Sequence, residues 1–255
     1  MAGKDIEYGE SPPSGLIDCL RRARRVAVLT GAGVSAESGI PTFREAQTGL
    51  WAQYDPMMLA SPQGFERNPE RVWNWYEWRR ELVGRTEPNA GHRALAELEP
   101  RFAEFTLITQ NVDGLHRRAG SRNVLELHGN IARNICSATR KPIDDDWIER
   151  HGDEKPPPSP HDRHGKARPD VVWFGEALGA AVLDRAFAAA SNCEVMLVVG
   201  TSGEVQPAAS LPLLARDHGA RIIDVNPERT SISAIADWHL AGPGGQWLPS
   251  IVNHL

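Results

Sequence analysis

The sequence predicts an α/β fold, with a parallel sheet covered by helices on both faces and a small second domain formed by two insertions. Three observations predict it: short apolar runs that end at glycine or polar residues, segments with helical spacing between them, and two long stretches that break the alternation. Strands that alternate with helices are typical of a parallel sheet buried on both faces. With 255 residues, the chain is long enough for one sizeable domain and a small addition.

Five short runs are predicted to be buried strands, because each is rich in apolar or β-branched residues and is followed at once by glycine or polar residues. They lie at residues 26–30, 105–109, 124–127, 195–199 and 221–225. Helical spacing of apolar residues marks the segments between them, at residues 92–99, 177–190 and 208–217.

Two stretches interrupt this alternation and are predicted to form the small domain. Residues 45–90 are rich in Trp and charged residues, which favours a helical insertion. Residues 131–169 carry an acidic cluster and three successive prolines, which favours a loop-rich insertion. The large sheet domain is assigned to residues 15–44, 91–130 and 170–255.

Composition argues against several classes of function. A formal net charge of -5 gives no electrostatic reason to expect binding of nucleic acid, which needs a strongly basic face. Charged residues precede any apolar run at the N-terminus, and no apolar span of ~18 residues follows, so we expect a cytoplasmic protein without a membrane segment. The three cysteines are scattered, which argues against a disulfide framework.

The residues after each predicted strand locate the functional site, because ligands of open α/β sheets bind beyond the carboxyl ends of the strands. Small, amide, hydroxyl and imidazole groups follow the five runs, at residues 31–36, 110–113, 128–130, 200–203 and 226–228. We therefore expect the site at this edge of the sheet.

The first of these turns, residues 31–36 (GAGVSA), matches the dinucleotide pattern G-x-G-x-x-G/A directly after a predicted strand. Glycines there let the main chain approach a pyrophosphate closely, so the turn predicts a Rossmann-type NAD site. A glycine-rich turn without a ligand is the alternative. The predicted cofactor contacts in this turn are Gly31, Ala32, Gly33, Ser35 and Ala36.

The sequence after this turn does not continue as in a nicotinamide dehydrogenase. Such an enzyme should next show a helix, a second strand and an acid about 20 residues further on that binds the ribose. Here Gly39 and Pro41 interrupt any long helix. The ribose partner must come from elsewhere, and Asn226 and Glu228, after the last predicted strand, are the natural candidates.

Several long motifs, in order along nearly the whole chain, resemble the sirtuin (Sir2) family. They are residues 31–44 (GAGVSAESGIPTFR), 109–116 (TQNVDGLH), 126–129 (ELHG), 168–176 (RPDVVWFGE) and 200–202 (GTS). The resemblance implies a protein-lysine deacylase that consumes NAD and releases nicotinamide, O-acyl-ADP-ribose and free lysine. It also implies a Rossmann domain with a small domain made from the two insertions.

By the same resemblance, His128 is the base that activates a ribose hydroxyl, a role suited to a group that titrates near neutral pH. Asn111 and Asp113 are implied to be polar partners around the nicotinamide and its ribose, with Gln110 beside them. A turn in which Asn111 and Asp113 cap the next helix is compatible with that role.

Further NAD contacts are implied at matching positions. Phe43 resembles the aromatic residue that covers the reacting ribose, and Arg44 would line the same pocket. The adenosine half of NAD is implied to lie near residues at the later strand ends and in the tail, although residues 242–245 (GPGG) depart from the usual tail. These implied contacts are Gly200, Thr201, Ser202, Asn226 and Gly244.

Two segments resemble those that hold an extended substrate peptide by main-chain pairing, so the implied partner is an acylated lysine in an extended segment of a protein. Such pairing gives affinity with little sequence preference, which leaves the protein substrate unnamed. The positions concerned are Val172, Trp173, Phe174, Gly175, Glu204 and Val205.

Tyr76 and Arg79 stand three residues apart, which places both on one face of a helix. Sirtuins that remove succinyl, malonyl or glutaryl groups resemble this stretch, with a small residue nearby that corresponds to Ala60. A guanidinium and a phenol can bind an acyl carboxylate by charge-assisted hydrogen bonds. We expect desuccinylation and demalonylation to exceed deacetylation. The alternative is that Tyr76 packs in the core and Arg79 pairs with a surface acid.

The zinc site is where this sequence departs from its family. The usual small domain carries two CxxC pairs, which give a closed tetrahedral thiolate site. Here Cys136 remains, Thr139 stands at its partner's place, and His161 and His164 stand at the second pair, with His151 or a nearby acid as further candidates. Since three of the four cysteines are missing, we expect that the metal has been lost.

Two alternative functions remain open. Another NAD-cleaving activity, ADP-ribosyl transfer or NAD hydrolysis, would use the same pocket without the peptide groove. A non-catalytic NAD-responsive binding module would not need an intact His128 with Asn111 and Asp113.

Overall fold

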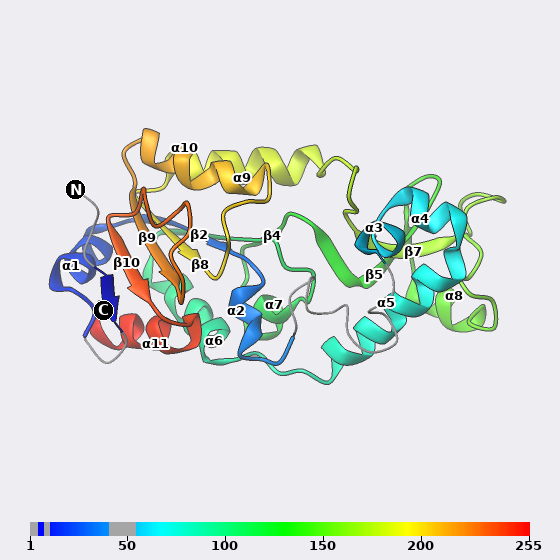
Figure 1. Cartoon of the computed structure of the whole chain (residues 1–255), viewed down its shortest axis with the longest axis horizontal. Helices are drawn as coiled ribbons and strands as arrows, with labels where there is room; N and C mark the ends of the chain where they lie inside the picture. Colours follow the sequence, from blue (N-terminus) through cyan, green and yellow to red (C-terminus); the bar gives the residue numbers. More distant parts are fainter. Residues whose placement is uncertain (1–4, 8–10, 41–54) are drawn as a thin grey trace.

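The computed structural model describes residues 5–7, 11–40 and 55–255. Within this part, seven strands form a parallel sheet in the order β1-β10-β9-β8-β2-β3-β4, which confirms the predicted α/β class (Figure 1). The strands are β1 (Asp5–Glu7), β2 (Arg25–Thr30), β3 (Glu104–Thr109), β4 (Val124–Glu126), β8 (Val195–Val199), β9 (Arg221–Asn226) and β10 (Trp238–Ala241).

The sheet is buried on both faces because its central strands are apolar on both sides. In β2, Val26 and Val28 pack into one hydrophobic cluster, whereas Leu29 packs into the other. Helices cover the two clusters from opposite sides (Figure 1). The first is covered by α1 (Ser14–Arg22), α6 (Ala90–Leu98) and α11 (Gly244–His254), and the second by α9 (Ala180–Asn192) and α10 (Leu211–Asp217).

A second, antiparallel sheet lies at the other end of the molecule's long axis, with strands in the order β6-β5-β7 (Figure 1). α5 (Pro69–Gly84) begins after Asn68, whose side chain accepts a hydrogen bond from the Arg71 N–H, and it packs on β5 and β7. The other elements here are α3 (Pro56–Leu59), α4 (Pro62–Arg67), β5 (Gly129–Cys136), β6 (Pro142–Ile143), α8 (Asp145–Arg150) and β7 (Ala167–Val171).

The structure contains elements that local sequence patterns did not indicate. Within residues 131–169, which were predicted to be rich in loops, the structure contains β6 and α8 as well as parts of β5 and β7, and β5 pairs with β7 across the segment. β1 and β10 extend the main sheet beyond the predicted strands. Phe43 and Arg44 lie outside the described residues. No helix in the described part is long and apolar enough to cross a membrane.

Candidate functional site

Two glycine-containing loops meet at the carboxyl ends of β2 and β8. The Gly33 N–H donates to the Gly200 main-chain oxygen at 2.8 Å, and the Gly31 N–H donates to the Val199 oxygen at 3.1 Å. A Cβ atom on Gly33 would lie 2.8 Å from Cα of Gly200, and Gly200 itself has a φ of +59°. Both positions therefore need glycine to let the two backbones touch.

The rest of the predicted phosphate-binding turn forms the short helix α2 (Gly33–Ala36). Val34 and Ser35 are buried there, whereas Ala32 and Ala36 are exposed. The turn thus exposes its two small alanine side chains to solvent, while Val34 and Ser35 anchor it in the fold.

Side-chain amides join the ends of three strands of the main sheet, β3, β8 and β9. The side-chain N–H of Gln110, which follows β3, donates to Thr201 Oγ1 at 3.0 Å. The Asn226 Nδ2 group, at the end of β9, donates to the Thr201 main-chain oxygen at 3.0 Å. Ser202 and Glu228 are exposed beside these amides. The structure thus brings together the predicted residues from three strand ends.

Ser35 links the first turn to the polar turn after β3. Its Oγ donates to Asp113 Oδ2 at 2.8 Å and accepts from Asn111 Nδ2 at 3.1 Å. Burial raises the pKa of Asp113, although its hydrogen bonds with the Leu115 N–H and with Ser35 act in the opposite direction. Asp113 Oδ1 also accepts the N–H of Leu115, the first residue of α7 (Leu115–Arg118), at 2.9 Å, although the N-cap residue of this helix is Gly114 and not Asp113.

His92 is a member of this cluster that the sequence interpretation missed. Its Nδ1 accepts the Asn89 N–H at 3.3 Å, so in the neutral ring Nε2 carries the hydrogen and donates to Ser35 Oγ at 3.3 Å. Burial lowers the pKa of His92 to about 4. Its position at the start of α6, three residues after Asn89, reads as a helix cap in the sequence, which is why the link to Ser35 was not foreseen.

His128 lies two residues after the end of β4, where it is half-buried. Its Nδ1 lies 2.9 Å from the Gln110 main-chain oxygen. Because a carbonyl oxygen can only accept, Nδ1 carries the hydrogen, and Nε2 of the neutral ring is left as a base. Burial lowers the pKa of His128, and the hydrogen bond to Gln110 acts against that shift. The ring is therefore neutral and fixed in one tautomer at neutral pH.

A second constellation lies on α5, beside the segment that follows β7. Tyr76 is 1% exposed, and its hydroxyl accepts the Trp173 Nε1–H at 2.9 Å. The Arg79 guanidinium carbon lies 4.9 Å from the centre of the Trp75 ring. Desolvation by burial lowers the pKa of Arg79, while the nearby Tyr76 and Asp113 raise it. Tyr76 and Arg79 thus lie on one face of α5, as predicted. The positive charge of Arg79 also interacts electrostatically with Asp113.

The predicted peptide segments present an exposed rim. Phe174 and Val205 are 48% and 49% exposed, and Gly175 and Glu204 are exposed beside them. The Val172 N–H donates to the His128 main-chain oxygen at 2.9 Å, which ties this rim to the candidate base.

Ala60 joins the same rim to the second constellation. The Ala60 main-chain oxygen accepts the Phe174 N–H at 2.9 Å, and the Ala60 side chain is buried in the hydrophobic cluster that contains Tyr76 and Trp173. The small residue predicted near the helix pair is therefore adjacent to it.

The remnants of the zinc module do not assemble. Cys136 Sγ is buried and accepts the Thr139 N–H at 3.4 Å, while His161 Nε2 lies 2.6 Å from the Pro142 oxygen. His164 is exposed and its Nε2 accepts from Arg163. Among the described residues, no three His, Cys, Asp or Glu side chains gather as metal ligands. These residues do not fit a structural zinc ion, which needs four converging ligands.

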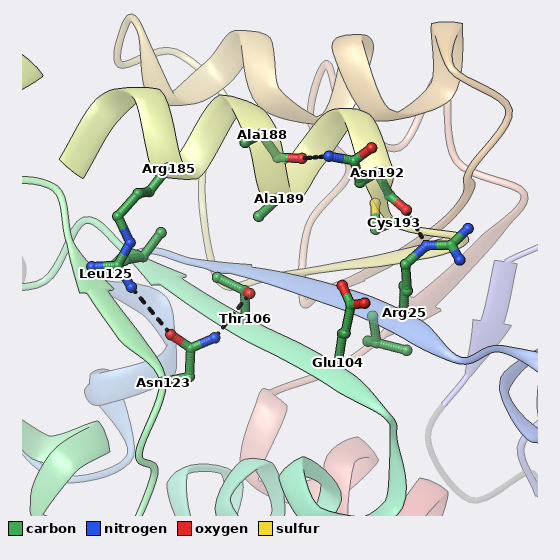
Figure 2. Close-up of a pocket in the computed structure, with 11 residues that line it drawn as sticks. Arg25, Glu104, Thr106, Asn123, Leu125, Arg185, Ala188, Ala189, Asn192 and Cys193 are labelled. Carbon is green, nitrogen blue, oxygen red and sulfur yellow. Dashed lines mark hydrogen bonds between the residues drawn. The ribbon is translucent and has the colours of Figure 1, made fainter. Parts of the chain in front are cut away.

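A cavity of ≈ 250 Å³ lies at the opposite edge of the sheet, beneath α9 (Figure 2). Arg25 and Glu104 from the starts of β2 and β3 line it, with Asn192 and Cys193 from the end of α9. The Arg25 Nε group donates to the Asn192 oxygen at 2.7 Å across one side. None of the residues predicted for the site lines this cavity.

Comparison with known protein families shows to which family the chain belongs. The Sir2 family model matches residues 31–207, which span both glycine loops, the Asn111 and Asp113 turn and His128. The chain belongs to the Sir2 family. One Sir2 relative, "NAD-dependent protein deacylase 1" of Pseudomonas aeruginosa, is 50% identical over 93% of this chain and 96% of its own length. The "NAD-dependent protein deacylase" of Aquifex aeolicus is 47% identical over 90% of this chain and 95% of its own.

Solved Sir2 structures share the fold closely. A Sir2 homolog–NAD complex is 45% identical and has a TM-score of 0.86, with 97% of this chain and 95% of that chain covered. A Sir2–p53 peptide–NAD⁺ complex is 32% identical and has a TM-score of 0.80, with 94% of this chain and 97% of that chain covered. The Sir2 fold therefore extends over nearly the whole chain.

Proposed function

We propose that this chain is an NAD-dependent protein-lysine deacylase that acts best on acyl groups with a terminal carboxylate. The observation that carries the deacylase proposal is the fixed tautomer of His128, which offers a neutral Nε2 at the strand edge where the glycine loops meet. The names of Sir2 relatives as NAD-dependent protein deacylases support the activity. The solved NAD and peptide complexes of Sir2 neighbours support NAD and an acylated protein segment as the two substrates.

The residues present fit NAD. The touching glycine loops leave small, backbone-lined surfaces suited to a pyrophosphate, and Thr201 and Asn226 lie next to them for the adenosine half. Asn111 and Asp113 would hold the nicotinamide half, positioned by Ser35. Phe43 and Arg44 are proposed as contacts of the reacting ribose on the family resemblance alone. The remaining proposed contacts are Gly31, Ala32, Gly33, Ala36, Gln110, Gly200, Ser202, Glu228 and Gly244.

NAD supplies an electrophilic ribose carbon whose bond to nicotinamide breaks when the acyl oxygen of the substrate attacks. In this chain, His128 Nε2 would accept the proton of a ribose hydroxyl, because its Nδ1 hydrogen is already committed to Gln110. The ribose oxygen would then attack the acyl carbon, and a water molecule would complete the reaction, so that free lysine and O-acyl-ADP-ribose leave. His128 acts after NAD is seated, so its role is distinct from binding.

The substrate would lie as an extended segment between Phe174–Gly175 and Glu204–Val205, whose side chains form the exposed rim. The N–H groups of Val172 and Phe174 already donate within the protein. Pairing with a peptide would therefore use other main-chain groups of this segment and of the opposing loop. Recognition through the main chain implies a broad range of protein substrates.

The acyl preference rests on Tyr76 and Arg79. Burial raises the pKa of the Tyr76 phenol, with Arg79 acting against it, so the hydroxyl stays protonated and can donate. A succinyl or malonyl carboxylate would accept a hydrogen bond from this hydroxyl and would pair with the positive charge of Arg79. An acetyl group has no carboxylate for either interaction. The small Ala60 side chain would leave room for the longer acyl group.

One assay tests the activity against its two alternatives. The purified chain is incubated with NAD and one peptide carrying acetyl-, malonyl- or succinyl-lysine, and nicotinamide and peptide products are quantified. Nicotinamide released with deacylated peptide is expected, fastest for succinyl and malonyl. Nicotinamide without peptide deacylation would instead identify an NAD hydrolase or ADP-ribosyltransferase, and NAD binding without turnover a binding module. His128→Ala is the control, expected to bind NAD and to release no deacylated peptide.

A further inference from the structure

Trp173 makes a contact that the peptide-binding role of its segment does not require. It follows β7, yet its side chain is 3% exposed and turns toward α5, where its Nε1–H donates to the Tyr76 hydroxyl at 2.9 Å. The direction of this bond is unambiguous, because an indole nitrogen is a donor only. The Tyr76 oxygen is therefore an acceptor here, and the single phenolic hydrogen is directed elsewhere.

The Trp173 ring is itself held firmly. The Arg168 guanidinium carbon lies 3.3 Å from the ring centre, and Arg168 is 4% exposed. Arg168 forms two hydrogen bonds with the Glu176 carboxylate, at 2.7 and 3.0 Å, and a third with the Val171 oxygen at 2.7 Å. Glu176 Oε2 also accepts the Trp173 main-chain N–H at 2.9 Å. The ion pair between Arg168 and Glu176 thus holds both the main chain and the ring of Trp173 in place.

This arrangement orients the phenol. A hydroxyl that accepts the Trp173 N–H cannot rotate its hydrogen toward the indole, so the hydrogen is restricted to the remaining directions. Trp173 and Tyr76 are both buried, so water cannot easily replace the bond. The cation above the indole face draws electron density from the ring, which strengthens the N–H as a donor.

We propose that Trp173 is a specificity-determining residue, which holds the Tyr76 hydroxyl as a donor for the carboxylate of an acidic acyl group. The inference deepens the proposed acyl preference and depends on it. Trp173 acts through Tyr76 and is a positioning residue. In this arrangement Arg79 supplies the positive charge and Tyr76 supplies the hydrogen-bond donor. Trp173 sets the direction in which that donor points.

The test compares wild type with Trp173→Phe, which keeps an aromatic ring and removes the N–H. We expect kcat/KM for a succinyl peptide to fall about 3- to 10-fold, the range for loss of one orienting hydrogen bond, chiefly through KM. The acetyl form of the same peptide should change less than about twofold, since it needs no phenol donor. Trp147→Phe is the matched control: it also loses an indole bond, to the Pro158 oxygen at 2.9 Å, and should keep the acyl ratio.

A double-mutant cycle with Tyr76→Phe separates orientation from packing. In the Tyr76→Phe protein, Trp173→Phe should have no further effect on succinyl turnover, because the hydroxyl to be oriented is absent. An equal loss for both acyl groups, or an undiminished loss in the Tyr76→Phe protein, would overturn the role of Trp173. A wild type without succinyl preference would instead refute the proposed function on which it rests.

A spectroscopic measurement keeps the inference testable if Trp173→Phe does not fold. In protein labelled with ¹⁵N-tryptophan, Tyr76→Phe should move one buried indole N–H resonance upfield, since that hydrogen loses its acceptor. The Trp147 indole resonance should stay in place and serves as the internal reference. Absence of any such movement would overturn the proposal.

Discussion

The Nδ1 atom of His128 lies 2.9 Å from the main-chain oxygen of Gln110, while the Gln110 side chain reaches Thr201 at 3.0 Å. One residue therefore sets the tautomer of the candidate base and also touches the loop proposed for the adenosine half of NAD. Because the tautomer is set by a main-chain atom, no substitution at position 110 removes that bond directly.

The pH dependence of turnover should report the state of His128. Burial lowers its pKa below the ordinary value of 6.5, so the neutral, active form persists as the pH falls past 6.5. At saturating NAD, we expect the acid limb of kcat/KM for the acylated peptide to have its midpoint below pH 6.5. A midpoint clearly above 6.5 would contradict the desolvated environment. Circular dichroism at each pH must show folded protein for the limb to be assigned to His128.

Arg79→Met should separate the two acyl classes. Loss of a charged hydrogen bond, worth about 1.5–3 kcal/mol, should cut kcat/KM for the succinyl peptide by one to two orders of magnitude. Removal of acetyl from the same peptide should be spared. Arg80→Met is the matched control, because the neighbouring Arg80 instead donates to the Ile131 oxygen and Asn134 Oδ1. Equal losses for both acyl groups in Arg79→Met, or faster deacetylation than desuccinylation by wild type, would refute this role.

Stability should fall in acid because of buried neutral histidines. Burial lowers the folded-state pKa of His92 to about 4, below the ordinary 6.5, and lowers that of His116 as well. As the pH falls, the unfolded chain therefore binds protons before the folded chain does. The contribution of these histidines to the free energy of unfolding is fully present above pH 6.5 and is lost toward pH 4, at about 1.4 kcal/mol per pH unit for each proton.

Urea unfolding at pH 8 and pH 5 measures this loss. His92→Gln should lower the stability at pH 8, because its bonds to Asn89 and Ser35 are replaced imperfectly. The loss of stability between pH 8 and pH 5 should also be smaller in His92→Gln than in wild type. Comparison of the two proteins cancels contributions from the carboxylates, and an unchanged difference between pH 8 and pH 5 would exclude His92 as a source.

Removal of metal should leave the protein intact. Cys136 and His161 bond to separate groups within the small sheet region, so we expect substoichiometric zinc by elemental analysis and an unchanged Tm after chelation. Stoichiometric zinc, lost together with the fold on chelation, would show that the family's metal site persists in an altered form.

The sequence predicted the central sheet well because each central strand is apolar and ends at a marked turn. Residues 195–199 are the clearest example, since every one of them is buried. The sheet formed by β5 and β7 could not be foreseen, because it pairs Cys136 with Ala167 across a long, polar segment. Likewise, the link from His92 to Ser35 depends on two helices that are distant in sequence.

Trp173 shows a different reason for incomplete prediction. Its segment matched a family motif, and the motif assigned it to peptide binding through the main chain. Which way a side chain turns after the last residue of a strand depends on the tertiary packing around it. Here that packing is the Arg168 and Glu176 pair, which only the folded structure brings beneath the ring.

The contact between Gly33 and Gly200 also limits how this enzyme can diverge. The two loops are joined by main-chain atoms, so an added methyl group at either glycine would force β2 and β8 apart at their tips. Mutations at these two glycines that aim to change the cofactor should therefore fail. Glu228, which is exposed at the neighbouring tip, offers room for new side chains, and a directed-evolution library placed there would preserve the scaffold.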